Sequence, residues 1–138
     1  MKGMHWLQIV ALFALTLLGL SATFYAGAAQ EKRWAAIDPN NETTSPVVWS
    51  NTEVKARSEA VEACKRSSKS CANGPASTSE MEDFFAVMCC TKPRRGCAVG
   101  VAGARQDALK NVQKIFADAG YSTCSLRHYL SAGSGKKD

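Results

Sequence analysis

The chain has 138 residues, with 17 Lys and Arg against 12 Asp and Glu, which gives a formal net charge of +5 at pH 7. This length leaves room for one domain, and so mild a positive charge does not by itself indicate an anionic partner. The basic residues are scattered and aromatic residues do not interleave with them, so no nucleic-acid groove is predicted.

The first 29 residues have the pattern of an export signal. Lys2 precedes an apolar run over residues 7–20, and the small residues 26–28, Ala-Gly-Ala, match a signal-peptidase site. The alternative is a retained membrane anchor, but the run is shorter than the roughly 20 apolar residues of a span. We therefore expect a signal peptide at residues 1–29, a periplasmic or secreted mature protein, and no stable membrane span after cleavage.

All six cysteines follow the predicted signal. An even number in a short exported chain indicates a disulfide framework, and zinc is the weaker alternative because no Cys-x-x-Cys pair occurs. Adjacent strand residues point to opposite faces, so the neighbours Cys89 and Cys90 are expected to pair elsewhere, with a redox pair as the alternative. Local pairing of Cys64 with Cys71, and a hairpin bridge from Cys97 to either neighbour, are options among connectivities that the sequence leaves open. The predicted disulfide cysteines are Cys64, Cys71, Cys89, Cys90, Cys97 and Cys124.

The first half of the domain reads as a hairpin followed by a helix. β-branched and aromatic residues predict strands over 34–37 and 46–49. Residues 50–53, Ser-Asn-Thr-Glu, match a capping box, so a helix is expected over 54–66 and a polar loop over 67–79. The expected buried face of this helix is Val54, Ala60, Val61, Ala63 and Cys64.

The second half has the same order of elements. Strands are predicted over 82–89 and 97–101, and a last strand over 124–130 in which Leu126, His128 and Leu130 alternate. A helix over 103–119 ends where Gly120 supplies a left-handed residue. Its apolar face is Ala108, Leu109, Val112, Ile115, Phe116 and Ala119.

The two halves also share a local pattern, because residues 56–61 and 104–109 both read A-R-x-[DE]-A-[VL]. Duplication explains the matching order of elements. We therefore predict an α+β fold of two pseudo-repeated β-β-α-β units that share one antiparallel or mixed sheet, with both helices on one face. The domain is expected at residues 30–130 and a flexible tail at 131–138.

The pattern of Trp, Ala and Cys residues resembles the small exported bacterial domains known as domain of unknown function 4189. The resemblance covers residues 34–130, with Cys90 and Cys97 as additional cysteines, and it implies an exported domain without implying an activity. It rests on Trp34, Trp49, Ala60, Cys64, Cys71, Phe85 and Cys89, and in the second half on residues 98–102, Ala108 and Cys124.

The densest basic stretch, Lys92-Pro93-Arg94-Arg95, is the candidate binding site. Guanidinium forks suit carboxylate and phosphate groups, so Lys92, Arg94 and Arg95 are the predicted binding residues. The alternative is a solvated hairpin loop without a partner.

No nucleophile, zinc, P-loop or dinucleotide motif occurs, and no catalytic residues, metal ligands or cofactors are predicted. The leading hypothesis is a binding or inhibitory, immunity-type module whose partner is an unidentified protein or envelope component. One alternative is an envelope-acting hydrolase that combines His128 with the acidic residues Glu80, Glu82 and Asp83. A structural envelope protein is the third hypothesis.

Overall fold

A computed structural model describes residues 32–71 and 74–138, so the predicted signal peptide at residues 1–29 lies outside the described residues. The elements follow the order strand, strand, helix, strand in each half of the domain. They are β1 (Trp34–Ile37), β2 (Val48–Ser50), α2 (Glu53–Lys65), β3 (Ala76–Thr78), β4 (Phe84–Lys92), β5 (Gly96–Ala102), α3 (Arg105–Asp118) and β6 (Ser122–Ser131).

The strands form two antiparallel three-stranded sheets. Sheet A has the order β2-β1-β3, and sheet B has the order β5-β4-β6. The predicted α+β class is confirmed, but the prediction of one shared sheet is wrong. In each half the first strand is the central one. Strands β2 and β3 both pair with β1, and strands β5 and β6 both pair with β4.

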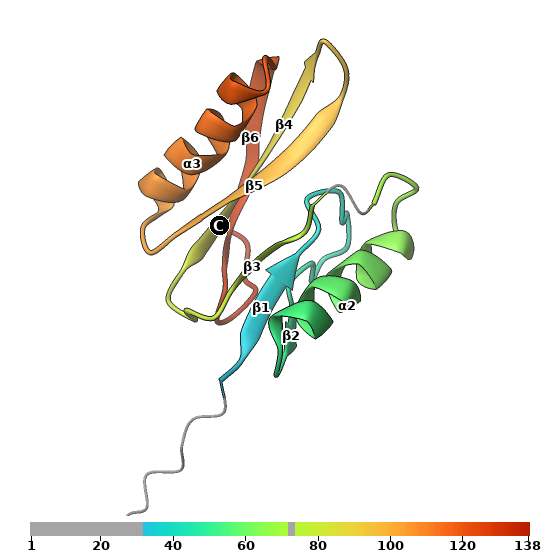
Figure 1. Ribbon diagram of the computed structural model, residues 1–138, viewed down its shortest axis with the longest axis vertical. Helices are drawn as coiled ribbons and strands as arrows, with labels where there is room; N and C mark the ends of the chain where they lie inside the picture. The colour runs from blue at the N-terminus through green and yellow to red at the C-terminus, as the bar shows by residue number, and fades with distance from the viewer. Residues whose placement is uncertain (1–31, 72–73) are drawn as a thin grey trace, which may run out of the picture. The chain divides into compact units, whose positions relative to one another are not determined.

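The two sheets pack face to face, and each carries a helix on its outer face (Figure 1). Side chains alternate between the faces of a strand, and both central strands are apolar on both faces. In β4, Phe85 and Val87 contact sheet A, while Ala86 and Met88 contact α3. The prediction that both helices lie on one face is therefore wrong, since the other face of each sheet is needed for the core between them.

Helix α2 begins one residue earlier than predicted and has a different cap. The side chain of Thr52 accepts a hydrogen bond from the Lys55 amide at 3.3 Å, so Thr52, and not Ser50, is the N-cap. The small buried face is Ala56, Ala60, Ala63 and Cys64, whereas Val54 is 80% exposed. Small side chains on this face let the helix lie close to β1.

Helix α3 agrees better with its predicted pattern. Ala108, Val112 and Phe116 are buried against sheet B, and Gly120 has the expected positive φ of 71° after the helix. Ile115 was expected to be buried but is 47% exposed. The buried stripe thus follows steps of four residues and is narrower than the sequence pattern indicated.

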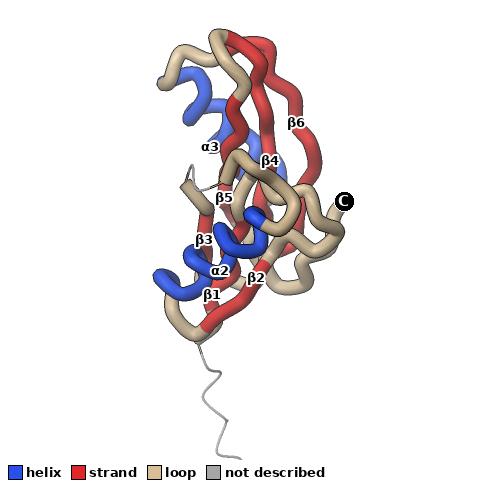
Figure 2. Tube along the Cα trace, turned by 90° about the vertical axis from the view of Figure 1, so that its right-hand side faces the viewer, coloured by secondary structure: helices blue, strands red, loops and turns tan. Residues whose placement is uncertain are grey.

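All six cysteines form disulfides, which confirms the predicted framework. Cys64 bonds to Cys71 after α2, Cys89 on β4 bonds to Cys97 on β5, and Cys90 on β4 bonds to Cys124 on β6. The last two bridges join all three strands of sheet B near the β4–β5 turn. This end of sheet B extends past sheet A in both views (Figures 1 and 2), so the covalent bonds stabilise the part of the sheet whose inner face sheet A does not cover.

Residues 131–138, predicted as a flexible tail, fold back along β6. Ala132 is fully buried and its carbonyl accepts a hydrogen bond from Trp49 Nε1 at 2.7 Å. Lys137 forms a β-bridge with Leu130, and Asp138 forms an ion pair with Arg105. The segment therefore contributes to the core and places Lys137 beside Leu130, near the end of the edge strand β6.

Among residues 32–71 and 74–138, no helix has the length and apolar character needed to cross a membrane.

Candidate functional site: a basic cavity

A cavity of about 520 Å³ lies where sheet B extends beyond sheet A. The strands of sheet A are three or four residues long, while β4 has nine. Sheet A therefore covers only part of the inner face of sheet B. The loops that leave β1 and α2 meet the uncovered part, and the cavity is bounded by these loops, by β4, β5 and β6, and by the C-terminal segment.

The loop side of the cavity consists of residues 39–42 with Ser68 and Ser70. Asn41 joins the two loops, because its Oδ1 accepts hydrogen bonds from the Thr43 amide at 2.9 Å and from Ser67 Oγ at 3.3 Å. Asn41 is only 5% exposed, and its Nδ2 has no hydrogen-bond partner among the described residues. A buried amide nitrogen without a partner is rare in proteins. This atom has almost no accessible surface, so it is enclosed by the two loops and does not face the cavity.

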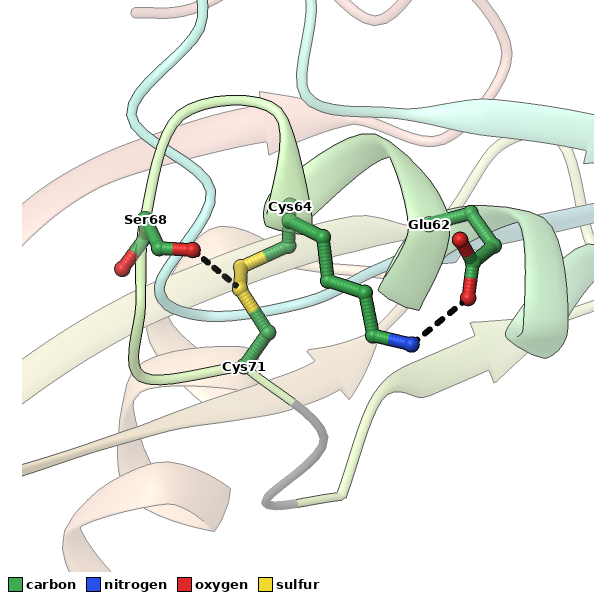
Figure 3. A network of polar contacts seen from close by, with 5 residues as sticks. Glu62, Cys64, Ser68 and Cys71 are labelled. Carbon is green, nitrogen blue, oxygen red and sulfur yellow. Dashed lines mark hydrogen bonds and ion pairs between the residues drawn. A yellow bond between two sulfur atoms is a disulfide. The ribbon is translucent and has the colours of Figure 1, made fainter.

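The Cys64–Cys71 disulfide holds the second of these loops against the end of α2 (Figure 3). Inside the loop, Cys71 Sγ lies 3.4 Å from the Ser68 carbonyl oxygen. Because a disulfide limits the conformations open to a short loop, the position of the Ser68 and Ser70 side chains at the cavity is restricted.

The sheet side of the cavity comes from the inner face of sheet B. Val87 and Cys89 contribute from β4, and Gly96 and Cys97 from β5. The Cys89–Cys97 disulfide is thus part of the lining itself. A covalently bridged sheet gives this side of the cavity a fixed shape.

An irregularity in β6 brings two basic side chains to the cavity. Val87 pairs with His128, and Met88 pairs with Leu126, so Arg127 is the extra residue of a β-bulge. Bulges change the direction in which side chains point, and Arg127 and His128, although adjacent, both line the cavity. The predicted simple alternation of residues 126, 128 and 130 is therefore wrong: Leu130 is fully buried, but Leu126 is 37% exposed.

The lining carries an excess of positive charge. Among the described residues, Arg95, Arg127 and Lys137 provide three cations, and Glu42 is the only carboxylate. The described part of the chain places none of these cations in an ion pair. Partial burial lowers the pKa of His128, and the nearby charges of Lys137 and Arg127 lower it further. The imidazole is therefore mostly neutral at pH 7.

The predicted basic stretch is divided by the structure. Arg95 lines the cavity, but Lys92 and Arg94 do not. Arg94 Nε donates a hydrogen bond of 2.9 Å to the hydroxyl of Tyr121, and this bond raises the pKa of Arg94. The two neighbouring arginines therefore have different surroundings, and only one is available to a ligand in the cavity.

The acidic residues of the hydrolase hypothesis do not join His128. None of Glu80, Glu82 and Asp83 lines the cavity, whereas His128 does. Asp83 instead accepts a hydrogen bond of 2.6 Å from Thr78 Oγ1 and caps the loop between β3 and β4. A carboxylate–imidazole pair for general acid–base work is thus not assembled from these residues.

One further cluster contains metal-ligating residue types. Asp38, Cys64 and Cys71 have potential ligand atoms within 4.8 Å of one another. The two sulfur atoms are bonded to each other in a disulfide, and metal binding by cysteine requires the thiolate. In the oxidised protein this cluster stabilises the loop and has no thiolate to offer to a metal.

Sequence reasoning missed Arg127, Lys137 and Asn41 as cavity residues. Arg127 is next to the singled-out His128, but strict strand alternation would place it on the opposite face. Lys137 reaches the cavity only because the C-terminal segment folds back along β6. No local pattern signals either event.

Comparison of the chain with known family models, with curated proteins and with solved structures finds no match.

Proposed function

We propose that the protein is an exported binding or inhibitory module that recognises its partner through the basic cavity. The observation that carries this proposal is the cavity itself, in which Arg95, Arg127 and Lys137 converge from separate segments with no ion-pair partner among the described residues. Clefts with a few convergent polar groups are the usual location of ligand sites. Disulfides on the loop side and the sheet side hold the lining in place, as a preorganised binding site requires.

Binding is favoured over hydrolysis because of what surrounds His128. Its neighbours in the cavity are cations, and the carboxylates once expected to assist it lie elsewhere. A general base is normally oriented by a hydrogen bond from a third group, and no such bond to His128 is present among the described residues. An imidazole between cations is better suited to contacting an anionic partner.

Export, family membership and internal duplication are part of the same proposal. Three disulfides are typical of proteins that mature outside the reducing cytoplasm, and the signal-like pattern supports export. The Trp and Cys pattern supports membership of the domain of unknown function 4189 family. Duplication is supported by the strand orders of the two sheets, since each half places its first strand between its second and third.

A matched pair of serine substitutions tests the binding function. Ser70→Trp places an indole at the cavity, and Ser58→Trp makes the same change on an exposed position of α2 outside the lining. The proteins are immobilised and exposed to envelope extract from the host cell. The proposal expects a component that the parent and the Ser58→Trp protein retain and the Ser70→Trp protein loses. Equal retention by both variants, or no retained component, would contradict it.

A further inference from the structure

We infer that the cavity is a specific site for a small ligand carrying a phosphate or carboxylate group on a hydroxyl-bearing body. The inference rests on the proposed binding function and names the chemistry that this function would recognise. It is argued from the charges, the donors and the size of the cavity.

The charges of the lining are unbalanced. Arg95, Arg127 and Lys137 line one concave space, and Glu42 is the only carboxylate that the described residues place there. None of the three cations has an ion-pair partner among the described residues. One carboxylate does not balance three cations, and a bound anion reduces the repulsion between them.

The charged donors of the lining are of the types that bind oxyanions. Two guanidinium groups and one ammonium group surround the space, and the planar fork of arginine matches the paired oxygens of carboxylate and phosphate. Lys137 is held beside the β1–β2 loop, where its Nζ donates to the Thr43 carbonyl at 3.3 Å. An ammonium group has three donors, so this contact leaves two for a ligand.

Polar, uncharged side chains line the loop side of the cavity. Asn40 and Asn41 lie in the loop between β1 and β2. Ser68 and Ser70 add hydroxyl groups on the same side. A ligand that has polar groups beyond its anion would use this side of the cavity.

The cavity is larger than a bare anion requires. The volume of about 520 Å³ falls within the range of small-molecule sites, about 300–1,000 Å³. A bare phosphate would occupy only a part of it near the arginines. The remaining space adjoins Asn40, Asn41 and the two serines, which favours a phosphorylated or carboxylated sugar over an isolated ion.

The test is equilibrium binding by calorimetry to the intact, oxidised protein. Glucose 6-phosphate, glucuronate and inorganic phosphate are the anionic probes, glucose is the neutral control, and phosphatidylglycerol vesicles present the same phosphate chemistry as a lipid headgroup. Arg95→Gln and Arg127→Gln remove cavity cations. Arg94→Gln is the matched control, because it removes the same charge one residue away from Arg95 but outside the lining.

We expect glucose 6-phosphate and glucuronate to bind more tightly than inorganic phosphate, and glucose not to bind. Each cavity substitution should weaken sugar-anion binding about tenfold or more, as expected for loss of a charged hydrogen bond, while Arg94→Gln should change it less than threefold. Circular dichroism of each variant confirms that it is folded.

Several results would overturn the inference. Glucose could bind as tightly as glucose 6-phosphate, the Arg94→Gln and Arg127→Gln proteins could lose equal affinity, or vesicles could bind more tightly than the soluble anions. The protein could also bind none of the anionic probes and still retain an envelope component that the Ser70→Trp protein loses. That result would overturn this inference and leave the binding function intact. Loss of both would remove the proposed function as well.

Discussion

Val87 of β4 lies directly opposite His128 of β6, and this pairing places the imidazole on the inner face of sheet B beside the cavity. The next pair along, Met88 with Leu126, skips Arg127. One inserted residue therefore sets two features at once: it gives the cavity an arginine and turns Leu126 toward solvent. The bulge in β6 therefore determines part of the positive charge of the candidate site.

The position of His128 predicts a pH dependence of stability. Its folded pKa is lowered from 6.5 by partial burial, then by the charges of Lys137 and Arg127, and Arg95 and Glu42 are the other charged residues of the lining. The unfolded state takes up the proton first as pH falls, so the stability due to neutral His128 is complete above pH 6.5. It is lost below that value, by at most about 1.4 kcal/mol per pH unit.

Urea unfolding at pH 7.5 and pH 5.0, for the parent and for His128→Gln, measures this effect. The parent should lose more stability than the variant between the two pH values. A variant that loses as much as the parent would show that other groups account for the whole acid sensitivity.

Gly100 on β5 is predicted to be indispensable for the packing of α3. A Cβ at this position would lie 1.9 Å from the Ala108 carbonyl oxygen and 2.6 Å from the Val112 amide nitrogen. The helix would have to move, and overpacking of this kind costs about 1–3 kcal/mol or more. Gly103→Ala is the control, because its Cβ would meet only Asp83 Oδ1 at 3.8 Å. Chemical denaturation should show a large loss for Gly100→Ala alone, and similar midpoints for both variants would contradict the close approach.

Val112 and Ile115 test which face of α3 is buried. Val112 is fully buried against sheet B, while Ile115 is 47% exposed. Val112→Ala should lower the free energy of unfolding by about 2 kcal/mol, because it removes buried methyl groups and leaves a cavity. Ile115→Ala should cost clearly less. Thermal melts of the two proteins decide the matter, and an equal or larger loss for Ile115→Ala would mean that the face is wrongly assigned.

The three disulfides should contribute unequally to stability. Cys90–Cys124 spans 34 residues and Cys64–Cys71 spans seven. The chain-entropy argument gives about 3.8 kcal/mol for the longer loop and about 2.4 kcal/mol for the shorter. Replacing each pair by alanines and measuring unfolding in urea should therefore show the larger loss for Cys90 and Cys124. The reverse order would show that strain or packing outweighs the loop effect.

Several elements were predictable because their signals are local. Strand β1, strand β4 and helix α3 follow from apolar periodicity, and Gly120 follows from the backbone it must adopt. Strand β3 was missed because Ala76-Ser77-Thr78 is short, polar and set in a loop; it becomes a strand only by pairing with β1. The separate sheets were missed because both central strands are apolar on both faces, which is compatible with several layer arrangements.

The candidate site was only partly predictable for a similar reason. Arg95 belongs to a visible basic stretch, and His128 stands out as the single histidine after the predicted signal. Arg127 depends on a bulge, and Lys137 depends on the return of the C-terminal segment. Tertiary contacts bring these residues together, so the sequence indicated some members of the site without indicating the cavity.

An NMR titration of the labelled protein with inorganic phosphate shows whether anions bind in the cavity. Amide shifts should concentrate at residues 40–42, 68–70, 95–97 and 127–128 and at Lys137, while the amides of the α3 lysines stay unperturbed. Shifts that centre on Lys110 and Lys114, or no shifts at all as phosphate is raised, would contradict binding in the cavity.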